Sequence, residues 1–216
     1  MMAGEAPSPY DEYGYIKNGK IFHLDGIDIG EVANSWVDIV NNVVYANVSA
    51  TRLTDGWSFS SSKMTSAPNY FPASSNYTVE TVIKPTSTAK QVIWTNVANS
   101  AGGANTPCLL VSGDGRFAFL QNNAAYNLSI TTGNAYCISL NTSVGLINGE
   151  DAEKSGTNYD LNNTSATAFI GTRNNGKLYY KGSIHSIRVY NRKLSISEML
   201  NNQQVDNQRF NLGLSI

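Results

Sequence analysis

Hydrophobic and polar residues alternate along this chain in short runs and do not follow a helical period. Residues 56–60 (GWSFS), for example, place two aromatic side chains on one face and two hydroxyl groups on the other, as in a half-buried β-strand. Turns rich in glycine and asparagine separate about twelve such runs at intervals of about 8–12 residues, which predicts an antiparallel β-sandwich. The predicted strands cover residues 20–24, 43–48, 56–60, 77–83, 91–95, 108–111, 116–120, 127–131, 135–140, 144–147, 168–170 and 182–190.

Two local signals refine this pattern toward the end of the chain. Ser195 and Glu198 have the spacing of a capping box, so we predict one short helix that begins after Ser195 and includes residues 199–205. Within the strand predicted over residues 182–190, the apolar positions change phase near His185. Such a change of phase predicts a β-bulge.

The two ends of the chain differ from the middle. Residues 1–15 contain three tyrosines and no period, and we predict an N-terminal arm. Residues 16–206 form the predicted sandwich domain. The alternation in residues 207–216 predicts a strand-like tail that pairs either with its own sheet or with a neighbouring subunit. The predicted assembly contacts on the arm and the tail are Tyr10, Tyr13, Tyr15, Phe210, Leu212, Leu214 and Ile216.

Composition restricts the classes of function. Of the 216 residues, 41% are hydrophobic and only 14% are charged, and the formal net charge is −1. Intrinsic disorder requires low hydrophobicity with high charge, and nucleic-acid binding is typical of basic domains, so neither class fits. The 26 asparagines and 18 glycines favour turns, such as a type I′ turn at Asn148–Gly149.

Charge is distributed unevenly along the chain. Residues 1–60 contain eight acidic and three basic side chains, whereas residues 171–216 contain two acidic and seven basic ones. This asymmetry either guides head-to-tail packing of copies of the chain or arises by chance in separate loops of one domain.

Two features bear on the cellular compartment. Residues 1–15 have neither the basic nor the apolar region of a secretory signal, and no run of 18 apolar residues occurs, so we expect neither a signal peptide nor a membrane span. Cys108 and Cys137 each lie in an apolar run, where they are either buried free thiols or the two halves of a disulfide.

Candidate catalytic residues are few. A glycoside hydrolase needs two positioned carboxylates, but Glu80 stands alone on its strand and we interpret it as structural. His23 and His185 each lie in a predicted strand, and we find no serine or cysteine motif paired with either. We therefore predict that the protein is not an enzyme.

Candidate binding residues follow from side-chain type and loop position. A sugar site combines an aromatic platform with a few polar groups, and a calcium site needs several oxygen ligands. We assign Trp57 and Trp94 to the core. The carbohydrate-binding candidates are Asn69, Tyr70, Phe71 and Trp36. The calcium-binding candidates are Asp25, Asp28 and Asp114, and no other cofactor is expected.

Several segments resemble, in order, the motifs of a known family. Residues 182–195 (GSIHSIRVYNRKLS) resemble the closing signature of the laminin-G-like, concanavalin A-like jelly rolls. Upstream, residues 22–26 (FHLDG), 77–85 (YTVETVIKP) and 144–149 (VGLING) resemble the opening strand, a central strand and a hairpin of that family. The resemblance covers roughly residues 16–210 and implies a jelly-roll fold with one short C-terminal helix.

The residues of the closing motif have structural explanations. Gly182 lets the chain enter the strand close to another backbone. Leu194 is spaced to pack against Met199 on the helix. We expect Arg188 and Arg192 to extend over the edge of the sheet, because long basic side chains keep their charge in water.

The resemblance leads to a functional hypothesis by family analogy. We predict a non-enzymatic structural or interaction protein of a bacteriophage particle, either a capsid decoration protein or a tail accessory protein. It would be made in the host cytoplasm, reside in the virion, and contact other virion proteins, copies of itself or a host-surface glycan. The alternative is a carbohydrate-binding adhesion module of a bacterial cell-surface protein, and a glycoside hydrolase is a remote third possibility.

Overall fold

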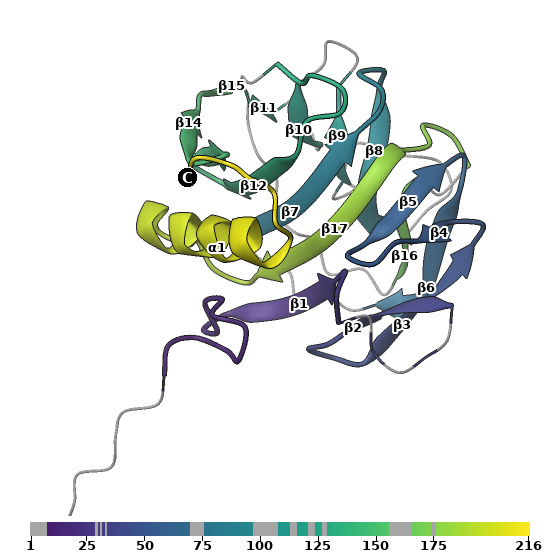
Figure 1. Cartoon of the computed structure of the whole chain (residues 1–216), viewed down its shortest axis with the longest axis horizontal. Coiled ribbons are helices and arrows are strands. Elements are labelled where there is room, and N and C mark those ends of the chain that lie inside the picture. Colours follow the sequence, from purple (N-terminus) through teal and green to yellow (C-terminus); the bar gives the residue numbers. More distant parts are fainter. Residues whose placement is uncertain are drawn as a thin grey trace, which may run out of the picture.

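The computed structural model has two facing antiparallel sheets and one helix (Figure 1). It describes residues 8–28, 30, 32, 34–69, 76–96, 108–112, 116–120, 124–126, 129–155, 166–173 and 176–216. Within these residues the chain forms 17 strands and a single C-terminal helix. The predicted all-β antiparallel sandwich with one C-terminal helix is confirmed.

The sheet nearer the helix has eight strands. They are β1 (Lys20–Asp25), β4 (Thr51–Arg52), β5 (Trp57–Ser60), β7 (Thr78–Pro85), β12 (Tyr136–Asn141), β13 (Gly145–Ile147), β14 (Glu150–Ala152) and β17 (Lys181–Tyr190). Their order is β14-β13-β12-β7-β17-β5-β4, and β1 also pairs with β17. The β13–β14 hairpin turns at Asn148 and Gly149, whose φ angles of 52° and 82° are both positive, as the predicted type I′ turn requires.

The second sheet has nine strands. They are β2 (Ser35–Asp38), β3 (Val43–Val48), β6 (Lys63–Asn69), β8 (Gln91–Asn96), β9 (Cys108–Val111), β10 (Phe117–Leu120), β11 (Ala124–Tyr126), β15 (Lys154–Ser155) and β16 (Ala166–Ile170). Their order is β15-β11-β10-β9-β8-β16-β6-β3-β2. The chain passes from the eight-stranded to the nine-stranded sheet at Glu153, between β14 and β15.

Aromatic side chains fill the space between the two sheets. Trp36, Trp57 and Trp94 are each at most 1% exposed and belong to one hydrophobic cluster. The alternation along β5 explains part of this core, since Trp57 and Phe59 point inward while the serines between and after them point outward. The assignment of Trp57 and Trp94 to the core is confirmed.

Strand β17 crosses the middle of the eight-stranded sheet and carries the predicted bulge. In its pairing with β7 the register shifts between Ile184 and Ser186, which makes His185 the extra residue. The core-facing positions therefore change from Ile184 before the bulge to Ile187 and Val189 after it. The outer face of β17 is thus divided into two halves with different surroundings.

The helix, α1 (Ile196–Arg209), lies across the outer face of the eight-stranded sheet (Figure 1). Its predicted capping box is present: Ser195 Oγ accepts a hydrogen bond from the Glu198 amide at 3.3 Å, and Glu198 Oε2 accepts one from the Ser195 amide at 2.8 Å. Leu194 and Met199 share a buried cluster, as predicted. The cap and this apolar contact fix the point at which the helix begins.

The helix continues to Arg209, and the chain then forms an irregular tail. The predicted boundary between domain and tail, at residue 206, therefore falls inside the helix. Positive φ angles at Asn211 (49°) and Gly213 (68°) interrupt the period-two pattern of residues 210–216. The prediction of a strand-like tail is wrong for this reason.

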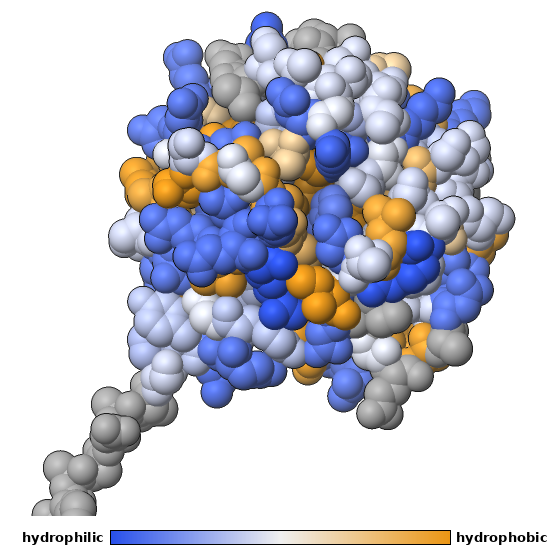
Figure 2. All heavy atoms as spheres, in the orientation of Figure 1, coloured by the Kyte–Doolittle hydropathy of each residue, from blue (hydrophilic) through white to orange (hydrophobic). Residues whose placement is uncertain are grey.

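The apolar side chains of the tail pack on the domain's own sheet. Phe210 is 4% exposed and lies against Val82 of β7 and Cys137 of β12. Leu212, Leu214 and Ile216 pack against the same cluster. Figure 2 shows orange residues gathered where the tail runs, beside the blue surface of α1. Of the two alternatives that the sequence left open, the structure has the tail on its own domain, where Phe210 is buried and Leu212, Leu214 and Ile216 are partly buried.

The segment before β1 also packs against the domain. Tyr15 is fully buried, and its hydroxyl donates a hydrogen bond to Asp206 Oδ1 at 2.9 Å. Tyr13 is half-buried and donates to Asp28 Oδ2 at 2.5 Å, whereas Tyr10 is 42% exposed. The predicted N-terminal arm is therefore wrong for Tyr15, and of the three tyrosines Tyr10 is the one that presents a large surface.

Acidic residues from the start of the chain and basic residues from its end meet inside the molecule. Arg209 Nε donates to Asp25 Oδ2 at 2.8 Å, and the Arg209 guanidinium lies 4.3 Å from the centre of the Tyr13 ring. Part of the charge asymmetry therefore serves to hold one domain together.

The two cysteines belong to different sheets. Cys137 in β12 is a buried free thiol, and burial raises its pKa well above the usual range. Strand β9 of the other sheet carries Cys108.

Candidate functional site

A buried ion cluster joins α1 to the eight-stranded sheet. Arg188 is fully buried after the bulge in β17. Its Nε donates to Glu80 Oε2 at 3.0 Å, and its two terminal nitrogens donate to Asp206 at 2.7 and 2.5 Å. The guanidinium also stacks 4.1 Å from the centre of the Tyr15 ring. The expectation that Arg188 extends over the sheet edge is wrong, because α1 covers this part of the sheet and supplies a carboxylate.

Glu80 completes this cluster from β7. It is 1% exposed and accepts hydrogen bonds from Arg188, from Ser139 Oγ at 2.9 Å and from Asn202 Nδ2 at 2.8 Å. Burial raises the pKa of Glu80, and the neighbouring guanidinium opposes that shift. These contacts support the interpretation of Glu80 as a structural residue.

The structure describes only some of the predicted carbohydrate-binding residues. Trp36 is 0% exposed, and its indole nitrogen donates to the Asp25 carbonyl oxygen at 2.7 Å. A fully buried ring offers no face on which a sugar could stack, so this prediction is wrong for Trp36. The side chain of Asn69, and Tyr70 and Phe71 entirely, lie outside the described residues.

The predicted calcium ligands do not come together. Asp25 is fully buried, and its carboxylate accepts from Arg209 and from the amides of Ile27 and Asp28 at 2.8 and 2.9 Å. A guanidinium already neutralises this carboxylate, so the prediction of Asp25 as a calcium ligand is wrong. Asp28 accepts from Tyr13, and Asp114 lies outside the described residues. Among the described side chains, no group of three His, Cys, Asp or Glu residues is placed to hold a metal ion.

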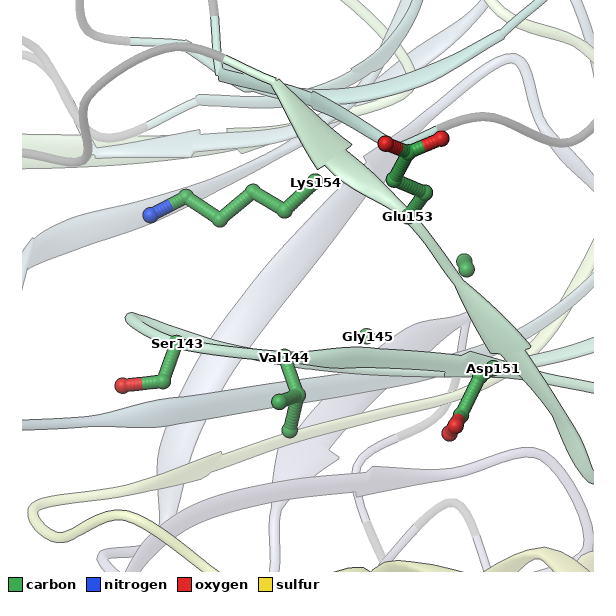
Figure 3. Close-up of a pocket in the computed structure, with 7 residues that line it drawn as sticks. Ser143, Val144, Gly145, Asp151, Glu153 and Lys154 are labelled. Carbon is green, nitrogen blue, oxygen red and sulfur yellow. The ribbon is translucent and has the colours of Figure 1, made fainter.

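A surface pocket of about 260 Å³ opens where the chain crosses between the two sheets (Figure 3). Its lining residues come from β13, β14 and β15 and from the turn before β13. They are Ser143, Val144, Gly145, Asp151, Ala152, Glu153 and Lys154. In Figure 3 the Lys154 side chain extends alongside the segment before β13 that carries Ser143 and Val144, while the Glu153 and Asp151 carboxylates point to different sides.

Local packing keeps this pocket in place. A Cβ atom on Gly145 would lie 2.5 Å from Tyr126 Cδ1, so this position has no room for a side chain. Lys154 Nζ donates to the Thr142 carbonyl oxygen at 2.8 Å, and Lys193 Nζ donates to Ser143 Oγ at 2.9 Å. Burial, and then the charge of Lys193, lower the pKa of Lys154.

Sequence reasoning treats Glu150, Asp151 and Glu153 as a solvated loop that follows the Asn148–Gly149 turn. Both pocket carboxylates are indeed exposed. The sequence signal that was missed is the change from the apolar Ala152 to the charged Glu153 and Lys154. The chain leaves the eight-stranded sheet and enters the nine-stranded sheet at this point. A change of sheet brings two sheet edges together and leaves a hollow between them.

A second polar group lies on β17 at the bulge and just before it. Ser183 Oγ and His185 Nε2 are 2.8 Å apart, and His185 Nδ1 lies 2.9 Å from the carbonyl oxygen and 3.5 Å from Oδ2 of Asp55. The expectation that neither histidine pairs with a serine is therefore wrong for His185. The sequence signal is Ser-x-His within one strand, since side chains two residues apart share a face.

Comparison with known proteins identifies the family. The family profile described as the Concanavalin A-like lectin/glucanases superfamily matches residues 58–199. The chain belongs to this superfamily. No curated protein matches the sequence.

Solved structures show the same concanavalin A-like fold. A Trypanosoma rangeli sialidase in complex with sialic acid superimposes with a TM-score of 0.60 at 14% identity, over 88% of this chain and 33% of the sialidase. A mutant of HCR/D superimposes with a TM-score of 0.60 at 16% identity, over 88% of this chain and 51% of that one. The chain therefore spans about a third and about half of these proteins. Identities this low show the fold alone.

Membership in this superfamily of lectins and glucanases supports a carbohydrate-binding or interaction module. Among the described residues, no helix is both long and apolar enough to cross a membrane.

Proposed function

We propose that this concanavalin A-like domain is a carbohydrate-binding module that uses the pocket between β13 and β15 and does not cleave glycosidic bonds. The observation that carries the proposal is the lining of the pocket. Val144 and Ala152 contribute apolar surface to this lining, and Asp151, Glu153 and Lys154 contribute charged residues. Carboxylates and ammonium groups make charge-assisted hydrogen bonds to hydroxyl groups, and a few polar groups on an apolar surface are typical of ligand sites.

The position of Glu80 supports binding over hydrolysis. A glycosidase carboxylate must reach the scissile bond, with a second carboxylate about 5–10 Å away. Glu80 lies beneath α1 with its oxygens bonded to Arg188, Ser139 and Asn202. This arrangement leaves it no route to a sugar.

Glycan-array binding tests the proposal. We expect Asp151→Asn combined with Glu153→Gln to lower the signal of the wild-type protein at least about tenfold, since each lost charged hydrogen bond costs roughly 1.5–3 kcal/mol. Glu150→Gln is the matched control, because Glu150 is an exposed acid of the same hairpin that does not line the pocket. Absence of signal on an array that includes bacterial polysaccharides, or an equal loss in the control, would overturn the proposal.

A second sugar-binding hypothesis concerns the predicted loop at Asn69, Tyr70 and Phe71. Side-chain type supports it, because an aromatic platform beside an amide suits a sugar ring. Tyr70→Ala and Phe71→Ala would then lower the array signal while the pocket variant retained it, which separates the two locations.

We further propose the narrower role of a virion component that acts through protein contacts as well. The resemblance of residues 182–195 to laminin-G-like jelly rolls supports it, as do the aliphatic side chains of Val40, Val44 and Val48 around the β2–β3 hairpin, which are 36–44% exposed. Exposed aliphatic groups of this kind are typical of contact surfaces. Mass spectrometry of purified particles should detect the chain, and Val44→Asp with Val48→Asp should reduce its incorporation. Its absence from particles would contradict this role.

A further inference from the structure

The outer face of the eight-stranded sheet is covered unequally. Helix α1 and the tail lie over one side of it, and the beginning of β17 and neighbouring β5 lie beyond their cover (Figure 1). Ser183 is half-buried there, between Ser58 of β5 and Lys84 of β7. Lys84 is exposed, so this part of the face is open to solvent.

The hydrogen bonds at Ser183 define the protonation of His185. Nδ1 faces two oxygens of Asp55, the carbonyl at 2.9 Å and Oδ2 at 3.5 Å, so Nδ1 carries the proton. Nε2 then has a free lone pair, which accepts the Ser183 hydroxyl at 2.8 Å. A serine, a histidine base and an oxygen that orients the histidine are the parts of an activated nucleophile.

The surroundings keep His185 neutral and ready to accept a proton. It is 7% exposed, and burial lowers its pKa below the usual value. Three charged groups face it from the packed elements: Asp55 from the β4–β5 turn, Lys84 from β7 and Asp206 from α1. The Phe210 ring lies 5.8 Å away and limits access of water from the tail side.

Lys84 adds positive charge next to the serine. It is the residue directly opposite Ser183 on β7, and directly opposite residues present their side chains on the same face about 5 Å apart. An ammonium group at this position can stabilise negative charge on an oxygen that forms at Ser183.

We propose that Ser183 is a nucleophilic serine, activated by His185 as general base, positioned through Asp55 and assisted by Lys84, that reacts with small carboxylic esters. This inference is independent of the proposed sugar pocket, which lies on other strands.

The reaction balances within these residues and water. Ser183 Oγ attacks the ester carbonyl carbon while its proton moves to His185 Nε2, and the oxyanion forms beside Lys84. The carbon–alkoxy bond then breaks, and the leaving alcohol takes the proton from His185. Water attacks the acyl-serine with His185 again accepting a proton, and the carboxylic acid leaves as Ser183 regains its hydrogen.

A fluorophosphonate probe, with mass spectrometry of the labelled peptide, tests the nucleophile in the full chain. We expect one adduct on Ser183, none in Ser183→Ala, and labelling at least about 100-fold slower in His185→Gln, the usual contribution of a general base. Ser60→Ala is the matched control, because Ser60 faces outward from β5 without a histidine partner and should label at the wild-type rate. No adduct, or equal labelling in His185→Gln, would overturn the proposal.

The pH profile separates catalysis from a structural role and needs no variant. Labelling of the wild-type protein should rise with a midpoint below about 6.5, the ordinary histidine value, and remain constant above it, because His185 is neutral there. Asp55→Asn should retain the fold, since the carbonyl contact remains, but shift this midpoint. Hydrolysis of p-nitrophenyl acetate should follow the same profile and fall about 10-fold or more in Lys84→Met. A rate that keeps rising through pH 9 would show an unassisted hydroxyl and contradict the mechanism.

Discussion

The two halves of the outer face of β17 use similar residues in different ways. After the bulge, the buried charge of Arg188 is matched by Glu80 and Asp206 under α1. On the other side, Ser183 and the bulge residue His185 form a hydrogen-bonded chain whose last member, Asp55, has a side chain that is 37% exposed. Polar side chains whose partners are all buried stabilise the fold and are out of reach of a ligand. A hydrogen-bonded chain with a solvent-exposed member can be reached by a ligand.

The largest expected effect concerns the covered half. Arg188→Met should lower the free energy of unfolding by about 3–5 kcal/mol, because it leaves Glu80 and Asp206 buried without a cation. Urea denaturation measures this, and Ser183→Ala should change it by less than about 0.5 kcal/mol. Adding Glu80→Gln and Asp206→Asn to Arg188→Met should restore part of the loss. A loss as large in Ser183→Ala would remove the contrast between the halves.

A smaller effect is expected where β17 begins. Gly182 has φ of 137°, and a Cβ atom there would lie 2.3 Å from the Lys84 carbonyl oxygen. Gly182→Ala should therefore cost about 2–3 kcal/mol and disturb the open half, since both strain and contact oppose the side chain. Gly133→Ala is the matched control, with a positive φ of 85° but no atom within 4 Å, and should cost about 1 kcal/mol. Thermal unfolding measures both variants. Equal midpoints for Gly182→Ala and Gly133→Ala would show that the close approach of Gly182 to β7 does not affect stability.

Acid should affect the covered region through His23. This side chain is fully buried, and burial followed by the charges of Arg188, Lys20 and Arg209 lowers its pKa well below 6.5. The unfolded chain then binds a proton that the folded chain does not, so stability is complete above about pH 6.5 and falls as pH decreases below it. We expect a loss of more than about 1 kcal/mol between pH 7 and pH 5, since one pKa unit corresponds to about 1.4 kcal/mol.

The control for this acid effect is the other histidine. Burial lowers the pKa of both histidines, further for His23, so His23→Gln should remove the larger part of the acid-induced loss and His185→Gln the smaller part. Urea midpoints at several pH values distinguish the two, and an equal contribution from both histidines would contradict the difference in their surroundings.

The smallest effect is expected at the half-buried Arg192–Glu198 pair, whose side chains are each 28% exposed. The Arg192 guanidinium lowers the pKa of Glu198 to about 2. A carboxylate with a lowered pKa stabilises the fold above about pH 4.3 and loses that effect as pH falls toward 2. Glu198→Gln should cost about 0.5–1 kcal/mol at pH 7 and close to nothing at pH 2, as measured by denaturant midpoints. If the cost of Glu198→Gln did not change with pH, it would come from the capping box with Ser195 and not from the ion pair with Arg192.

The sequence predicts the elements well where one local rule decides. The residues 43–48 are a strand with the same bounds as β3, the capping box starts α1, and the bulge is at His185. Alternation, capping and phase are properties of neighbouring residues, so they can be recognised without the fold.

The errors arise where a distant element decides. Alternation shows that Arg188 faces outward but cannot show that α1 covers that face. The period in residues 210–216 is that of a strand, yet two positive φ angles there produce an irregular tail. Trp36 has the type of a sugar platform, and it belongs to the core only because the facing eight-stranded sheet covers it. The pair Ser183 and His185 was visible in sequence, but its orientation toward Asp55 depends on a turn about 130 residues away.

The bulge at His185 also matters for protein engineering. Because one extra residue reverses the facing of everything that follows, deleting it would turn Arg188 toward the aromatic interior and place Ile187 beneath α1. If the bulge is kept, the two parts of β17 can be changed separately. Residues before the bulge could be replaced to build a new site, while the residues after it continue to hold α1 through Arg188.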